Sequence, residues 1–162
     1  MTRSSRTSDV WDALDGKLRV CALAFRDYGG RAAFHGRVET VRTFEDSSFV
    51  RRTLETEGLG RVLVIDGGGS LRASLIGGNV ARGAIERGWA GVVVHGAIRD
   101  ADEFAGLDIG LKAMGTHPGK PRRDGYGAVG EALNLGGILI APGDYLYADL
   151  DGIVVLDEPL AN

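Results

Sequence analysis

Short apolar runs, each followed by glycine or a polar turn, set the pattern of this chain. Residues 61–66 (RVLVID) and 91–96 (GVVVHG) are the clearest runs. β-Branched runs of this length are typical of strands that are buried on both faces. Between them, apolar residues recur at helical spacing and predict a helix that begins at Leu71 or Asn79 and ends at Arg87. The pattern therefore predicts a β–loop–α–β unit with parallel strands and a right-handed crossover.

Weaker patterns predict further elements on both sides of this unit. A first helix is expected to be capped by Thr7 or Ser8 and to end at Leu14, before Gly16. The polar, glycine-rich residues 116–132 predict an exposed loop. The remaining predicted elements are a strand over 34–41, a helix over 46–56, a helical turn over 102–107, and strands over 109–114, 135–140, 145–148 and 153–156. This mixture predicts an α/β fold.

Composition supports one domain. The chain has 162 residues and is 44% hydrophobic, and a chain of this length buries enough surface to fold without disulfides. Glycine is in excess, with 26 residues, and it lies in short clusters beside the apolar runs. Clusters in such places indicate tight turns and close backbone approaches rather than a flexible linker.

Charge and residue usage exclude several classes of protein. Lys and Arg total 19 and Asp and Glu total 22, so the net charge of −3 gives no general attraction to nucleic acid or to an anionic membrane. No apolar run reaches the length of a membrane span, and the first 16 residues lack the apolar core of a signal peptide. The one cysteine, Cys21, excludes an internal disulfide framework and suits a reducing cytosol. We therefore expect a cytoplasmic protein with no membrane partner and no direct nucleic-acid partner.

Two glycine segments are candidates for anion binding through backbone N–H groups. Residues 67–69 follow a predicted strand, but Arg72 stands where a dinucleotide-binding loop has its third glycine. A structural turn is the favoured interpretation there. Residues 77–80 (GGNV) lie just before the helical pattern, where free N–H groups converge and could bind a small carboxylate. The alternative for this segment is an ordinary helix start.

The pair Arg99-Asp100 follows the second buried strand. The carboxyl ends of parallel strands form the ligand crevice of open α/β sheets. Arg99 could bind a carbonyl or enolate oxygen through two N–H groups, and Asp100 could bind a hard divalent cation. The alternative is a surface ion pair at a helix start. The apolar run around Lys112 favours a snorkelling lysine over an imine-forming one.

These motifs together resemble the regulator of ribonuclease activity A (RraA) family, which includes the 4-hydroxy-4-methyl-2-oxoglutarate aldolases. The family motif is a glycine, twenty residues, Arg-Asp, two residues, and Asp or Glu. Here Gly78, Arg99-Asp100 and Glu103 match it. The resemblance runs from about Phe25 to Leu156, and its carrying segments include GRVLVIDGGGSLRASLIGGNVA and GWAGVVVHGAIRDADE.

The resemblance implies a fold and an assembly. The fold would be the swivelling β/β/α domain of RraA-like type, as one domain over residues 25–162. Residues 1–24 would form an N-terminal helical segment packed on it. The assembly would be a homotrimer, or two trimers paired as a hexamer.

The resemblance also implies a metal-dependent lyase that acts on 2-oxo acids. Aldolase members cleave 4-hydroxy-4-methyl-2-oxoglutarate into two pyruvates, and they decarboxylate oxaloacetate as a parallel activity. By analogy, Arg99 would bind the keto oxygen and Asp100 would hold the divalent cation, Mg²⁺ or Mn²⁺. The residues that would bind the pyruvyl carboxylate are Gly77, Gly78, Asn79 and Val80.

One departure from the family pattern bears on catalysis, and one alternative function stays open. Several aldolases carry Asp where Gly78 stands, so a proton-transferring group here would have to come from elsewhere, such as Asp102, Glu103 or an acidic residue near the C-terminus. The alternative function is that of a non-enzymatic regulator, which inhibits ribonuclease E by protein contact. Some such regulators lack the Asp of the Arg-Asp pair, and the presence of Asp100 favours the metal-dependent lyase.

Overall fold

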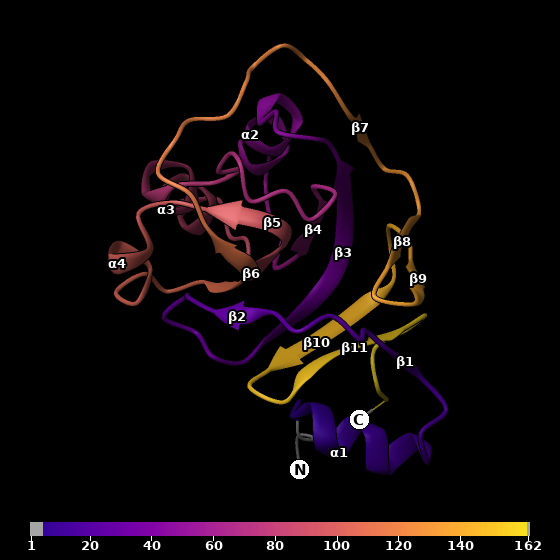
Figure 1. Ribbon diagram of the computed structural model, residues 1–162. Coiled ribbons are helices and arrows are strands. Elements are labelled where there is room, and N and C mark those ends of the chain that lie inside the picture. The colour runs from indigo at the N-terminus through magenta and orange to yellow at the C-terminus, as the bar shows by residue number, and fades with distance from the viewer. Residues whose placement is uncertain (1–4, 162) are drawn as a thin grey trace.

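The computed structural model describes residues 5–161, so residues 1–4 of the predicted N-terminal segment and residue 162 lie outside it. Its centre is a sheet of four parallel strands in chain order (Figure 1). These strands are β3 (Phe34–Arg42), β4 (Val62–Asp66), β5 (Gly91–Ile98) and β6 (Gly110–Thr116). The parallel β–α–β unit predicted around residues 61–96 is therefore confirmed.

The long strand β3 connects this sheet to a second layer. The first half of β3 pairs antiparallel with β10 (Tyr145–Asp149), and its second half pairs parallel with β4. Beyond β10 follow β11 (Gly152–Leu156) and β1 (Arg19–Val20). The other strands are the hairpin β8 (Leu133–Leu135) and β9 (Ile138–Ile140), β2 (Arg26–Asp27) against β6, and β7 (Ala128–Val129) against β3.

Alternation along the buried strands decides which layer each side chain meets. Val62 and Val64 pack with apolar residues of the β8–β11 layer. Leu63 and Ile65 point the other way and pack with residues of α2 (Ser48–Leu54) and α3 (Gly78–Glu86). The layers are thus β, β and α, with the second sheet and the helices on opposite sides of β4 and β5 (Figure 1). The predicted α/β fold is confirmed as this β/β/α arrangement.

Several details of the structure differ from the prediction. The apolar stretch 135–140 is not one strand, because β8 and β9 are separated by Gly136 and Gly137, which both have positive φ. The segment 116–132 is mostly exposed, as expected, but it contains the short strand β7. Lys112 does not snorkel, because it is 2% exposed. Its Nζ lies 2.8 Å from a carboxylate oxygen of Asp27 and donates to the Asp149 carbonyl at 2.6 Å.

The first helix, α1 (Thr7–Leu14), is capped by another part of the chain and not by Thr7 or Ser8. Arg6 occupies the N-cap position, and the Asp149 carboxylate accepts hydrogen bonds from the Thr7 N–H at 2.8 Å and the Thr7 hydroxyl at 2.7 Å. Burial would raise the pKa of Asp149, but the hydrogen bonds from Thr7 and from the Asp151 N–H, together with the charge of Lys112, outweigh burial and lower the pKa. Val10 of α1 packs into the apolar cluster on β10 and β11.

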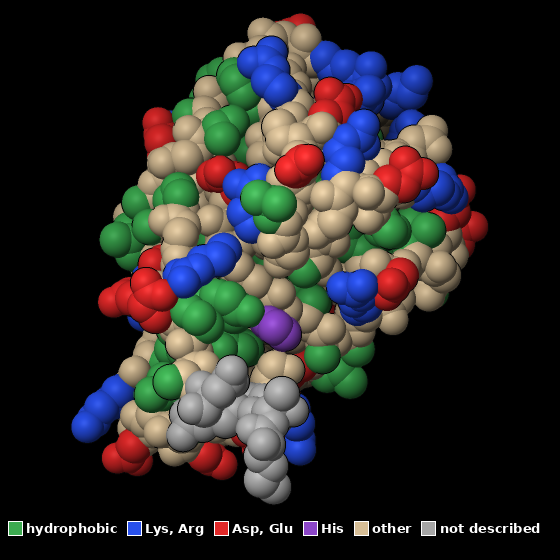
Figure 2. All heavy atoms as spheres, turned by 180° about the vertical axis from the view of Figure 1, so that it is seen from behind, with side chains coloured by type: hydrophobic (Ala, Val, Ile, Leu, Met, Phe, Trp, Pro, Cys, Tyr) green, Lys and Arg blue, Asp and Glu red, His purple; other side chains and the backbone are tan. Residues whose placement is uncertain are grey.

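The surface carries both signs of charge. Figure 2 shows positive and negative side chains interspersed over most of one face. No helix in the described part of the chain is long and apolar enough to cross a membrane.

Candidate functional site

The segment between β4 and α3 brings the glycines at 77 and 78 to the carboxyl end of β5. The Leu75 N–H donates to the Ala97 carbonyl at 2.8 Å, and the Arg99 N–H donates to the Ile76 carbonyl at 3.1 Å. The segment therefore runs beside the end of β5 and delivers Gly77 next to Arg99. The helix α3 starts directly afterwards, at Gly78.

The glycine loop over residues 67–69 anchors this segment at its other end. The N–H groups of Gly67 and Gly69 both donate to the His95 carbonyl, at 3.0 and 3.1 Å. A Cβ on Gly67 would lie 2.6 Å from the Leu75 side chain and 2.9 Å from that carbonyl. A glycine is thus required here by close packing of the backbone.

Asp100 has a backbone conformation that is rare for residues with a side chain. Its φ of 61° and ψ of 37° lie in the left-handed region, which costs roughly 1–2 kcal/mol in a residue other than glycine, with Asp and Asn the most tolerant. Its Oδ2 accepts a hydrogen bond from the Gly78 N–H at 2.9 Å. Conformations of this kind gather at functional sites. Here the conformation turns the carboxylate toward the start of α3.

The start of α3 keeps two donors available. The Gly78 N–H is used by Asp100, and the Ala81 N–H donates to the Gly77 carbonyl. Among the described residues, the N–H groups of Asn79 and Val80 have no acceptor. They lie at the positive end of the helix dipole, where a carboxylate is stabilised.

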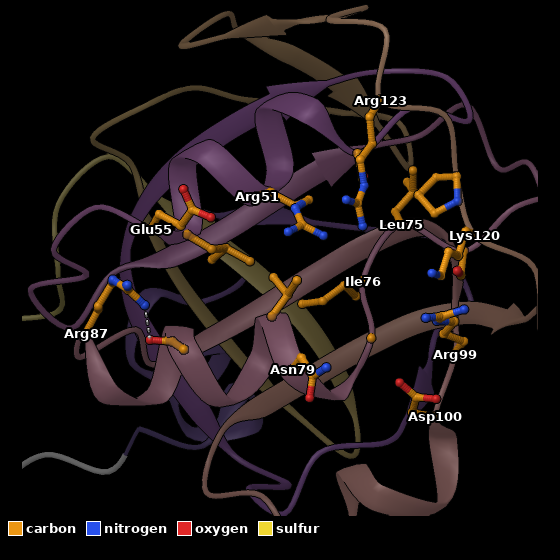
Figure 3. A pocket seen from close by; sticks show the side chains of 17 residues that line it. Arg51, Glu55, Leu75, Ile76, Asn79, Arg87, Arg99, Asp100, Lys120 and Arg123 are labelled. Carbon is orange, nitrogen blue, oxygen red and sulfur yellow. Dashed lines mark hydrogen bonds between the residues drawn. The ribbon is translucent and has the colours of Figure 1, made fainter.

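These groups meet in a cavity of about 400 Å³ between α2, α3 and the loop after β6 (Figure 3). Of the predicted site residues, five line it, whereas Gly78 is buried and does not line it. Those that line it are Gly77, Asn79, Val80, Arg99 and Asp100. Four cations that the sequence did not predict also line it, namely Arg51, Arg87, Lys120 and Arg123.

The donor set near Arg99 fits a hard cation that keeps other ligands. Asp100 supplies one carboxylate there, and no group of three or more His, Cys, Asp or Glu gathers anywhere within residues 5–161. Mg²⁺ is commonly bound through one or two carboxylates, with water and substrate oxygens completing the octahedron. A structural zinc site would need four protein ligands. The residues present therefore fit Mg²⁺ or Mn²⁺ and do not fit structural zinc.

Glu103 lies close to Gly78 but is occupied by an ion pair. A Cβ on Gly78 would overlap the Glu103 carboxylate, which receives a hydrogen bond from Arg82 at 2.6 Å. Glu103 does not line the cavity. The acidic residue that completes the motif thus lies outside the cavity and supports the start of α3 from the outside.

Comparison with known proteins agrees with the fold. The family model described as RraA-like, Aldolase/RraA, matches residues 7–155. A 4-hydroxy-4-methyl-2-oxoglutarate aldolase of Thermus thermophilus is 50% identical over 155 residues, which is 96% of this chain and 94% of that protein.

Two solved structures superpose closely on the whole chain. One is described as the RNA-processing inhibitor RraA from Thermus thermophilis, with 48% identity, a TM-score of 0.94, and coverage of 98% of this chain and 96% of that one. The other is described as an S-adenosylmethionine:2-dimethylmenaquinone methyltransferase from Geobacillus kaustophilus, with 46% identity, a TM-score of 0.94 and 96% coverage of both chains. The chain therefore belongs to the RraA-like family.

Proposed function

We propose that this protein is a divalent-metal-dependent lyase that releases pyruvate from 2-oxo acids. Its substrates are 4-hydroxy-4-methyl-2-oxoglutarate and, as a parallel activity, oxaloacetate. The observation that carries the proposal is the meeting of Arg99, Asp100 and the free N–H groups of α3 at one cavity. The name of the 50% identical relative supports the same reaction class.

Each group has a role set by its chemistry. The N–H groups of Asn79 and Val80 bind the carboxylate at C1 of the substrate. The Arg99 guanidinium donates to the keto oxygen at C2 and stabilises the negative charge that develops there. Gly77 and Gly78 allow the close approach of substrate and of Asp100, and the Gly78 N–H fixes the Asp100 carboxylate.

Asp100 is the residue that would hold Mg²⁺ or Mn²⁺. The cation supplies a Lewis acid for the charge that forms on the keto oxygen. Asp100 is held by the Gly78 N–H and follows Arg99 directly in the chain. The Asp100 carboxylate and the Arg99 guanidinium would therefore keep a fixed position relative to each other.

The two reactions share one product-forming step. In the aldol cleavage the C3–C4 bond breaks, its electron pair stays on the C3 side as pyruvate enolate, and the C4 hydroxyl loses its proton to water. C4 thereby becomes the keto carbon of a second pyruvate, and C3 takes a proton from water. In oxaloacetate the C3–C4 bond breaks to release CO₂, and the same enolate takes a proton at C3. One set of enolate-stabilising groups therefore serves both substrates.

Replacement of Arg99 or Asp100 by Ala tests the assignment. Both variants should lose pyruvate release from oxaloacetate above the background of the metal alone, as measured by coupling to lactate dehydrogenase. Unchanged turnover in both variants would remove these residues from the site.

A second candidate function is inhibition of ribonuclease E by protein contact, favoured by the 48% identical structure described as an RNA-processing inhibitor. For either function we propose a cytoplasmic homotrimer or hexamer. A regulator should inhibit the host's ribonuclease E equally well with Asp100→Ala as with the native sequence. Absence of binding at micromolar protein would rule it out.

A further inference from the structure

Among the described residues, three of the five cations that line the cavity lack both a counter-ion and a side-chain hydrogen bond. Arg51 comes from α2, and Lys120 and Arg123 come from the loop after β6. Within residues 5–161, no carboxylate lies within 4.0 Å of any of the three, and their side chains have no hydrogen-bond partner. Most arginines elsewhere in the fold are paired with Asp or Glu, namely Arg19, Arg31, Arg37, Arg42, Arg61, Arg72 and Arg82.

The backbone holds two of these cations in place. The Arg122 carbonyl accepts a hydrogen bond from the Ser47 N–H at 2.9 Å, and the Asp124 N–H donates to the Asp46 carboxylate at 2.6 Å. Both neighbours of Arg123 are therefore tied to the start of α2, the helix that carries Arg51. Figure 3 shows the two guanidinium groups pointing into the cavity, toward one another.

Asp46 is suited to this anchoring role. It is 1% exposed, and burial alone would raise its pKa. Hydrogen bonds from the Ser48 hydroxyl and from the backbone N–H groups of Ser48, Asp124 and Tyr126 outweigh burial and lower the pKa. The carboxylate thus stays ionised and keeps the loop attached near neutral pH.

Two cations held close together repel one another unless an anion lies between them. A 2-oxo monocarboxylate uses its single carboxylate at the start of α3 and leaves Arg51 and Arg123 without a partner. A 2-oxo dicarboxylate has a second carboxylate beyond the bond that breaks. The cavity wall between the two ends includes the apolar side chains of Leu75, Ile76 and Val80, which suit a carbon chain.

We propose that Arg51 and Arg123 bind the second carboxylate of a 2-oxo dicarboxylic acid, with Lys120 adding positive charge beside it. This inference rests on the proposed function for the position of the first carboxylate. The three cations then determine specificity, because they distinguish a dicarboxylic from a monocarboxylic 2-oxo acid of the same length. They contact the part of the substrate that leaves and not the part that forms the enolate.

Direct binding tests this assignment without relying on turnover. The probes are 2-oxoglutarate and 2-oxopentanoate, which have the same five-carbon chain and differ by the second carboxylate. Calorimetry with Mg²⁺ present should give at least tenfold tighter binding of 2-oxoglutarate to the native protein. Arg51→Gln and Arg123→Gln should each reduce that preference to less than threefold and leave the affinity for 2-oxopentanoate within twofold.

Neighbouring arginines provide matched controls. Arg52 and Arg122 adjoin the two residues in the chain but do not line the cavity. Arg52→Gln and Arg122→Gln should keep the native preference. Equal affinity of the native protein for the two probes, or a preference that survives in both cavity variants, would overturn the inference. A protein that prefers 2-oxoglutarate but releases no pyruvate would instead contradict the proposed lyase function alone.

Discussion

Gly77→Ala is predicted to impair the site while leaving the fold intact. The φ of Gly77 is −126° and its ψ is −177°, an extended conformation that alanine adopts freely. The added Cβ would lie 2.9 Å from Asp100 Oδ2 and 3.4 Å from Cγ and Nε of Arg99. The substitution thus presses on both residues that we assign to the keto oxygen and the cation.

The size of the effect follows from the overlap. Ordinary contact to a Cβ begins at 3.4 Å, so the Asp100 oxygen must retreat by 3.4 − 2.9 = 0.5 Å. A lengthening of its 2.9 Å bond to the Gly78 N–H by that amount would take the bond past the usual upper limit of about 3.2 Å. Because misplacement by about 1 Å can cost roughly a hundredfold in rate, half of that displacement should cost about tenfold, or ~1.4 kcal/mol of barrier.

The assay is steady-state pyruvate release from oxaloacetate with saturating Mg²⁺, beside urea unfolding of the same preparation. The free energy of unfolding should change by less than about 1 kcal/mol, because alanine also restricts the unfolded chain. Gly106→Ala is the control, since its Cβ would come no closer than 3.7 Å to its nearest neighbour, the Glu103 carbonyl. A Gly77→Ala enzyme with kcat/KM within twofold of native would refute the reasoning.

Two further predictions concern stability. Asp46→Asn should destabilise the protein most at neutral pH, because the pKa of Asp46 is lower in the folded protein than in the unfolded chain. The stability that the Asp46 carboxylate contributes is therefore present above its unfolded pKa of about 3.9. It is lost as the pH falls through the folded pKa. Urea unfolding at pH 7 and pH 3 checks this, and an equal deficit at both pH values would contradict it. Lys112→Met should lower the free energy of unfolding by about 2 kcal/mol, because it leaves the partly buried Asp149 carbonyl and the Asp27 carboxylate without their donor. An unchanged urea midpoint would show that this lysine contributes nothing to stability.

Much of the central sheet could be predicted because its long strands contain apolar, β-branched runs that are recognisable in the sequence alone. Residues 62–65 and 92–94 are continuous apolar runs, and they lie within the strands β4 and β5. The strands β1, β2 and β7 have two residues each. Strands this short have no periodicity, and only their pairing with β11, β6 and β3 makes them strands.

Part of the candidate site could likewise be predicted from the sequence, and part could not. Arg99, Asp100 and residues 77–80 could be selected because they sit at a strand end and a helix start, which local patterns reveal. The cations could not, because Arg51 is typical of the polar face of a helix and Arg123 of a solvated loop. The hydrogen bond that joins their segments, from the Asp124 N–H to Asp46, spans 78 residues. No spacing rule in the sequence connects positions so far apart.

The most direct test of the account is pyruvate release from 4-hydroxy-4-methyl-2-oxoglutarate and from oxaloacetate, each measured with Mg²⁺ or Mn²⁺ and again with EDTA. A metal-dependent lyase should turn over both substrates, lose turnover in EDTA and recover it when the cation is restored in excess. Folded protein that releases no pyruvate from either substrate above the metal-only background would contradict the lyase function and favour the ribonuclease regulator.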